Sequence, residues 1–293
     1  MLRIVRGNHE AVMKFARILS KVAVMATVLL SQSVLAWSQI TVDYVGSADF
    51  GSGGVGYQTG TMAPHESPNS NSLATVAIGG DSFSSSNHSF QFNPGTGTTK
   101  FNVWCVDIMD WLTDGNRVYD VITGASSVIS TLGATLQAQR SVASYGVTGA
   151  QRVADLIKLA NQRYGTVDTQ LESAAFQLAV WAISFGAAHG GNYDITASIG
   201  SSPSTNVGTE GFVVGSATKT SAAGVLADQW LNTLDETIAG EKNYQIAYLS
   251  DNPNHSTQDM VVFYAPAPAT IALFAIGLLA FSFALRKRAY PSL

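Results

Sequence analysis

The chain has 293 residues, of which 46% are hydrophobic and only 12% are charged, a composition that allows a sizeable core and is ordinary for an exported protein. The net charge of −4 is unevenly distributed: half of the 16 basic residues lie in the first 36 and last eight positions, which leaves residues 37–264 with eight basic against 19 acidic side chains, a net charge of −11. A region this acidic repels phosphate backbones and anionic lipids, which argues against nucleic-acid binding.

The N-terminus has the layout of a secretory signal peptide. Basic residues precede an apolar run over residues 22–30, and small residues follow as far as Ala36, where we expect cleavage. The apolar run is short for a membrane span, so we favour a cleaved signal over a retained anchor. The signal is therefore predicted at residues 1–36, with the start left open between Met1 and Met13, because Met13 opens a signal of more ordinary length.

Residues 37–123 have the composition of β-strands joined by loops. Alternation of apolar and polar side chains predicts strands at residues 40–46, 89–94, 100–108 and 117–123. The turn-rich stretch 51–62 and the polar stretch 81–89, DSFSSSNHS, are interpreted as loops. The only cysteine of the chain, Cys105, lies on the third of these strands among large apolar neighbours.

The chain becomes rich in Ala, Leu and Gln from about residue 126 to residue 185. Helical spacing of apolar residues predicts helices at residues 149–165, 168–186 and 221–240. The second of them should begin with Asp168 or Thr169 as its N-cap and end at Gly186. Two closing strands are predicted at residues 243–250 and 257–266. This order indicates an α+β domain at 37–264, a β-sheet or sandwich with a helical segment packed on it.

The C-terminus is predicted to be a membrane-spanning tail. Residues 265–285 carry no charge and are long enough to cross a bilayer as a helix, and the basic cluster behind them would keep its far end in the cytoplasm. A proline pair, an apolar helix and a basic end together resemble the PEP-CTERM sorting tag of Gram-negative bacteria, which implies processing by a membrane-embedded exosortase. The sorting signal would comprise Pro266, Pro268, Arg286, Lys287 and Arg288. Because Ala267 replaces the usual glutamate between the prolines, a plain anchor stays open as the alternative.

Two residues of the middle region are anomalous. Exported proteins usually carry paired cysteines, yet Cys105 stands alone. Gln177 lies on an otherwise apolar helical stripe, where an unpaired amide group costs about 1–3 kcal/mol. One reaction would account for both: the Cys105 sulfur attacks the side-chain carbonyl of Gln177, ammonia leaves, and an internal thioester remains. Both polar groups are then lost from the core, and the electrophile is protected from water until a nucleophile reaches it.

The surrounding sequences, WCVDI and FQLAVW, resemble the paired motifs of bacterial thioester domains. These motifs have an aromatic residue before the cysteine, and a glutamine followed after two residues by an apolar residue and tryptophan. The resemblance implies that Cys105 and Gln177 form the thioester. The side chains around it would be Trp104, Phe176, Val180 and Trp181. It also implies one covalent turnover with an amine on a protein lysine or amino sugar, so the protein would be a binder for adhesion or matrix anchoring, and not an enzyme.

A general base would help to deprotonate the incoming amine, and His189 and Asp107 are the candidates. Two other interpretations stay open. In the first, Cys105 and Gln177 are ordinary buried residues of a non-covalent structural component of the envelope or of an extracellular polysaccharide (biofilm) matrix. Alternatively, Cys105 is the nucleophile of a Cys-His hydrolase with His189 or His255, although a strand position does not lower a thiol pKa as a helix N-terminus does.

No cofactor or metal site is predicted. Asp107, Asp110 and Asp114 precede Gly115, but their spacing is wrong for a calcium loop. The histidines are scattered, and no glycine-rich phosphate loop precedes a helix. We therefore expect an exported protein of the envelope or extracellular matrix, anchored transiently or permanently by its C-terminal helix.

Overall fold

The computed structural model describes residues 38–48, 57–63, 73–85, 100–108, 110, 112, 117–138, 146–188, 192–196, 211–251 and 257–265. The chain divides after Trp37, and all of these residues belong to the unit that begins at Ser38. The signal peptide predicted at 1–36, the strand predicted at 89–94 and the tail after Ala265 lie outside the described residues. None of the helices within these ranges is long and apolar enough to span a bilayer.

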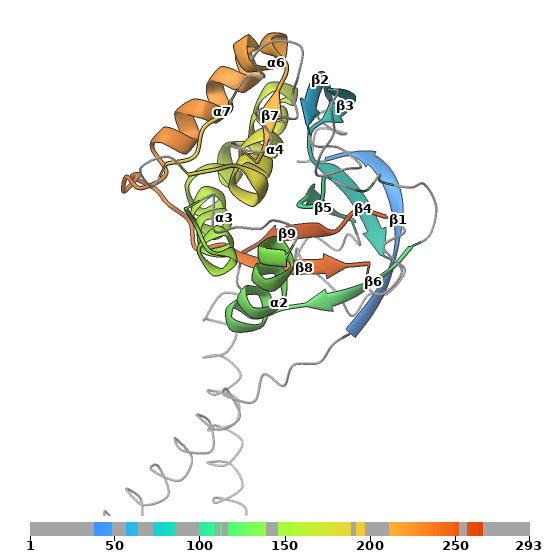
Figure 1. Ribbon diagram of the computed structural model, residues 1–293. Helices are drawn as coiled ribbons and strands as arrows, with labels where there is room; N and C mark the ends of the chain where they lie inside the picture. The colour runs from blue at the N-terminus through green and yellow to red at the C-terminus, as the bar shows by residue number, and fades with distance from the viewer. Residues whose placement is uncertain are drawn as a thin grey trace, which may run out of the picture. The chain divides into compact units, whose positions relative to one another are not determined.

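Six strands form a closed barrel in the order β1-β4-β5-β9-β8-β6, in which every neighbouring pair is antiparallel (Figure 1). They are β1 (Ser38–Ser47), β4 (Asp81–Ser85), β5 (Lys100–Cys105), β6 (Arg117–Ile122), β8 (Gln245–Ser250) and β9 (Met260–Tyr264). The buried ring of Phe83 lies 6.0 Å from that of Tyr119 and 6.2 Å from that of Phe101, between centroids. Phe83 and Phe101 are paired residues of the neighbouring strands β4 and β5, whereas the contact with Tyr119 joins β4 to β6, which are not neighbours, so these rings form the core of the barrel.

Within the described residues, a smaller sheet and five α-helices accompany the barrel. The sheet has the order β3-β2-β7, with β2 (Gln58–Ala63), β3 (Ala74–Ile78) and β7 (Val213–Val214). The helices are α2 (Ala125–Ala138), α3 (Gly149–Arg163), α4 (Gln170–Phe185), α6 (Ser216–Thr220) and α7 (Ala222–Asn232), with a 3₁₀ turn η2 (Tyr164–Thr166). Helix α4 packs on β5 of the barrel, on β2 and β3 of the small sheet, and on α3 and α7 (Figure 1). It is the element that joins the two sheets.

The sequence of α4 explains both its ends and its central position. Thr169 and Glu172 form a capping box, because the Thr169 hydroxyl accepts from the Glu172 N–H and the Glu172 carboxylate accepts from the Thr169 N–H. Of the two predicted caps, Thr169 is therefore the one used, and not Asp168. Gly186 ends the helix as predicted. Every residue in 173–185 is buried, so α4 is a core helix and not a surface one.

The predicted elements around the site are confirmed within a few residues, and so is the mixed α and β class. The sheet, however, closes into a barrel, where a sheet or sandwich was expected. The loop prediction for residues 81–89 is wrong at its start, because Asp81–Ser85 form β4 between β1 and β5. Phe83 anchors this strand in the core, and pairing on both sides outweighs the weak strand propensity of its serines. The turn prediction for 51–62 likewise misses β2.

Candidate functional site

Cys105 and Gln177, 72 residues apart in sequence, meet in the interior. Cys105 ends β5, and Gln177 lies in the middle of α4. The backbone N–H of Cys105 donates to Oε1 of Gln177 at 3.1 Å, and Nε2 of Gln177 donates to the Cys105 carbonyl at 2.9 Å. The pairing of β4 with β5 ends where Asp81 lies opposite Val103. Beyond this pair, the Gln177 amide takes the place of a β4 residue as the hydrogen-bond partner of Cys105. The amide is thereby held in a fixed orientation against the cysteine.

The sulfur of Cys105 is buried and free. Its thiol donates to the backbone carbonyl of Asp107, with 2.9 Å between Sγ and the oxygen. Burial raises the thiol pKa well above its ordinary value, the nearby indole N–H of Trp181 opposes the increase, and the negative charges of Asp107 and Asp81 add to it. The thiol is therefore protonated at neutral pH, which disfavours the hydrolase interpretation because that chemistry needs a thiolate.

Of the two predicted base candidates, only Asp107 lies within the described residues. His189, like His255, lies outside the described residues. Asp107 is buried and turns its backbone carbonyl toward the sulfur, but it is not among the residues that line the cavity beside Cys105. Of the three acids that precede Gly115, Asp114 lies outside the described residues, and the described part of the chain contains no group of three or more potential metal ligands.

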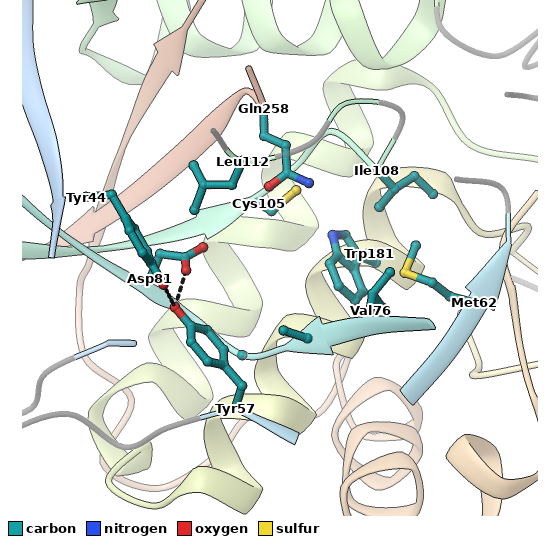
Figure 2. Close-up of a pocket in the computed structure, with 12 residues that line it drawn as sticks. Tyr44, Tyr57, Met62, Val76, Asp81, Cys105, Ile108, Leu112, Trp181 and Gln258 are labelled. Atoms are coloured by element: carbon teal, nitrogen blue, oxygen red, sulfur yellow. Dashed lines mark hydrogen bonds between the residues drawn. The ribbon is translucent and has the colours of Figure 1, made fainter. Parts of the chain in front are cut away.

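A cavity of about 220 Å³ lies beside Cys105. It is smaller than the roughly 300–1,000 Å³ typical of drug-sized ligand sites, so a single side chain or a small amine is the kind of occupant it fits. Figure 2 shows the cysteine between two unlike walls. The apolar wall is formed by Met62, Val76, Ile108 and Trp181. The polar wall is formed by Tyr44, Tyr57 and Asp81.

The polar wall is a hydrogen-bonded chain. The Tyr57 hydroxyl donates to Oδ1 of Asp81 at 2.5 Å, and the hydroxyl oxygens of Tyr44 and Tyr57 are 2.7 Å apart. Burial raises the pKa of Asp81 to about 7, although the hydrogen bond from Tyr57 opposes the increase. Burial and the charge of Asp81 also raise the pKa of Tyr57 far above its ordinary value, so this phenol remains a donor.

Trp181 and Val180, predicted to enclose the pair, behave differently. Trp181 lines the cavity; its buried indole N–H makes no hydrogen bond within ordinary geometric limits, yet it lies close enough to the Cys105 sulfur to oppose the rise of the thiol pKa. Val180 is buried within α4 but is not a lining residue.

The other two predicted neighbours, Trp104 and Phe176, pack against each other with 4.6 Å between ring centroids. Trp104 follows the alternation of β5 and therefore points away from the face that Cys105 uses. Gly80 leaves room for its ring, because a Cβ there would lie 2.7 Å from the nearest ring atom. The Gly80 N–H also donates to the hydroxyl of Ser173 on α4 at 3.0 Å, which fixes the helix next to Asp81.

The sequence analysis missed the polar wall. Asp81 stands at the start of a stretch interpreted as a polar loop, and Tyr57 in a stretch interpreted as turns. The alternation of residues around Phe83 could have predicted a strand here, with Asp81 and Phe83 on the same side of it. Nothing in the local sequence indicates that this carboxylate faces a cysteine 24 residues later.

Comparison with known proteins identifies one motif and two similar structures. Residues 265–288 match the PEP-CTERM protein-sorting motif, which confirms the predicted resemblance of the tail to this motif and indicates an exported, envelope-associated protein. A search of curated proteins finds no match. The chain is similar to the N-terminal thioester domain of fibronectin-binding protein SfbI from Streptococcus pyogenes, with 11% identity, a TM-score of 0.37, and coverage of 76% of this chain and 100% of that one.

It is also similar to the N-terminal thioester domain of a surface protein from Clostridium perfringens, with 12% identity, a TM-score of 0.36, and coverage of 77% of this chain and 99% of that one. TM-scores this low carry no argument about function, so the function must be inferred from the site itself.

Proposed function

We propose that this exported protein attaches covalently to an amine on a partner molecule through an internal thioester between Sγ of Cys105 and Cδ of Gln177. The observation that carries the proposal is the pair of hydrogen bonds by which the backbone of Cys105 holds the amide of Gln177. Burial of a glutamine requires only that its amide find partners. Here both partners belong to the one cysteine of the chain, in the interior of an exported domain.

The geometry supports formation of the thioester. The Cys105 sulfur attacks Cδ of Gln177, and the thiol proton passes to the amide nitrogen, which leaves as ammonia. Negative charge develops on Oε1 during the attack, and the Cys105 N–H that already donates to this oxygen stabilises it as an oxyanion hole does. Burial keeps water away from the product, so that hydrolysis does not compete.

The thioester would then react once with an amine that enters the cavity beside Cys105. The nitrogen attacks Cδ of Gln177, the sulfur leaves as the thiol of Cys105, and an amide links the partner to the protein. Because the acyl group is consumed, the protein acts as a covalent binder and not as an enzyme. The cavity of about 220 Å³ suits a lysine side chain or the amino group of an amino sugar at the edge of a larger molecule.

The sorting motif supports a location for this chemistry. An exosortase-type enzyme would process the tail, and the apolar segment predicted at 265–285 would hold the protein at the envelope of a Gram-negative cell before or after processing. Adhesion to a surface, or anchoring in an extracellular polysaccharide matrix, is the role that such an exported covalent binder would serve.

The test is the intact mass of the full chain, purified from the envelope without amine-containing buffers. The mass of Cys105→Ala, corrected for the substitution, gives the mass expected without a thioester. Wild type should be lighter than this by one ammonia. Gln177→Glu should show no such deficit. Methylamine should add to wild type alone. A full mass in freshly prepared wild type, with a thiol that titrates at once after denaturation, would establish the alternative: a non-covalent structural component in which Cys105 and Gln177 are ordinary buried residues.

A further inference from the structure

Asp81 is a buried acid that the Cys105–Gln177 pair does not itself require. Its side chain is on the wall of the same cavity as Cys105, and the residue is only 7% exposed (Figure 2). Tyr57 donates to one carboxylate oxygen. Within the described ranges, no basic side chain forms an ion pair with Asp81. A buried carboxylate without a cation is costly, and one neutral donor offsets only part of that cost.

The position of Asp81 is that of a proton-transfer group. Its side chain lines the cavity beside Cys105, and its negative charge, after that of Asp107, is one of the factors that raise the pKa of the thiol. Asp107, the acid nearest in sequence, offers the sulfur a backbone carbonyl instead and does not line the cavity. Perturbed acids in a cleft beside a reactive pair are frequently functional.

We propose, building on the thioester function above, that Asp81 carries the proton in the acyl transfer from Cys105 to an amine, and that Tyr57 and Tyr44 position its carboxylate. The neutral amine attacks Cδ of Gln177 and forms a tetrahedral adduct with a positive nitrogen and a negative oxygen. The Asp81 carboxylate accepts one proton from that nitrogen. The carbon–sulfur bond breaks, the carbonyl re-forms, and the Asp81 carboxyl gives its proton to the departing sulfur. Amine and thioester become amide and thiol, and Asp81 returns to its starting state.

The electrostatics agree with this role. A group that must accept a proton and then return it works best when its pKa is near the working pH, and burial raises the pKa of Asp81 to about 7. The titratable groups that face it are Tyr57, Tyr44 beyond it, and Cys105 across the cavity. Both Tyr57 and Cys105 have pKa values raised above their ordinary ranges, so Asp81 is the member of this group that titrates near neutrality.

The same group should act when the thioester forms. Loss of ammonia from the Cys105–Gln177 pair is the reverse of attack by ammonia on the thioester, so the proton path must be shared. Asp81→Asn is therefore expected to slow both ammonia loss and the reaction with added amine. Asparagine keeps the acceptor oxygen for Tyr57 and the size of the side chain, which makes it the closest variant that cannot take a proton.

The experiment follows methylamine incorporation by mass in the full chain, after the ammonia deficit has been verified in each sample. At pH 7, Asp81→Asn should react about 100-fold more slowly than wild type, the lower range for loss of a general base. The control is Asp235→Asn, an acid on the protein surface paired with Lys158, which should react like wild type.

A second variant tests how the rate of reaction with methylamine depends on pH. Tyr57→Phe removes the hydrogen bond that lowers the pKa of Asp81, so the midpoint of its rate profile should move upward from about 7. Ionisation of methylamine is the same in both proteins and cancels in this comparison. A purely structural Tyr57 would change the rate without moving the midpoint.

The outcomes separate this inference from the function on which it rests. If wild type shows no ammonia deficit, the thioester function fails and the role of Asp81 fails with it. If wild type and Asp81→Asn both show the deficit and react with methylamine equally fast, Asp81 has no part in proton transfer and the thioester function stands. If Asp81→Asn fails to fold or to form the thioester, Tyr57→Phe decides: a raised midpoint supports the inference, and an unchanged midpoint overturns it.

Discussion

Two of the buried tyrosine–aspartate pairs among the described residues have the same chemistry and different surroundings. Asp81 accepts from Tyr57 beside the cysteine, and Asp155 of α3 accepts from Tyr193 at 2.8 Å. The second carboxylate oxygen of Asp155 accepts from Gln151 at 2.9 Å, and the charge of a nearby lysine favours its ionised form. Burial raises both pKa values, but only Asp155 has donors on both oxygens.

The difference separates a structural acid from a reactive one. A cavity of about 190 Å³ also lies beside Asp155, yet the one cysteine of the chain lines the other cavity. A carboxylate with donors on both oxygens is stabilised in its ionised form and is held in place by two bonds. A carboxylate with a single donor, facing a thiol and a fixed amide, keeps the capacity to exchange protons. Four measurements test whether the two regions differ in this way.

The largest difference is expected from the proposed thioester, which would lie in the Asp81 region and not near Asp155. A thioester between residues 72 apart would restrict the unfolded chain as a disulfide does, stabilising the fold by about 4 kcal/mol for a loop of this length. Opening it with methylamine should lower the free energy of unfolding by that amount, measured by urea denaturation. Cys105→Ala should not respond to methylamine. Equal stability of wild type before and after treatment would contradict a cross-link.

The next effect is a dependence of stability on pH. The pKa of Asp81 is about 7 in the fold against an ordinary value of 3.8, so the folded state binds the proton more tightly than the unfolded state. Its stabilising contribution is therefore complete below about pH 4 and is lost as the pH rises to 7, on the order of 4 kcal/mol by linkage. Denaturation in the Cys105→Ala background, with and without Asp81→Asn, measures this.

In that background, Asp81→Asn should remove most of the decline in stability between pH 4 and pH 8. The pKa of Asp155 is also raised by burial, so Asp155→Asn should remove a part of the decline as well. If the decline is unchanged by Asp81→Asn, the carboxylate is not held in the buried state that the structure describes.

The third measurement compares the two acids at pH 7. Asp155→Asn should lower the free energy of unfolding by about 1–3 kcal/mol, because an asparagine cannot accept from both Tyr193 and Gln151. Asp81→Asn should leave stability unchanged or increase it, since Tyr57 keeps its acceptor and an uncompensated charge is lost. Opposite signs would support the distinction between the two pairs. A similar loss from both variants would show that Asp81 is structural too.

The parts of the site that depend on neighbouring residues could be predicted from the sequence, and the parts that depend on distant segments could not. The strand that ends in Cys105 and the helix that carries Gln177 were both predicted, because alternation and capping are properties of neighbouring residues. Their pairing was predicted from chemistry, as two anomalies that one reaction would resolve. Barrel closure and the placement of Asp81 were not, since both depend on which distant segments pair with β4. Serine-rich strands carry little local signal, and their pairing partners decide their structure.

The smallest effect concerns α3, which carries Asp155, and α4, which carries Gln177, since each begins at a threonine cap. Thr148 accepts from the Gln151 N–H at the start of α3, and Thr169 accepts from the Glu172 N–H within the capping box of α4. Replacing either with alanine should cost about 1 kcal/mol in the free energy of unfolding, with the larger loss at Thr169, where a reciprocal bond is also lost. Thermal denaturation followed by circular dichroism measures both.

Neither cap should affect the ammonia deficit if the position of Gln177 is set by its own bonds to Cys105 and not by the end of the helix. Gln177 lies two turns beyond Thr169, within the part of α4 that is wholly buried against β5 and the small sheet. A slower loss of ammonia in Thr169→Ala, with Thr148→Ala unaffected, would instead show that the first turn of α4 helps to hold the amide. The helix that carries Asp155 would then serve as the reference for a loss of stability without a loss of reactivity.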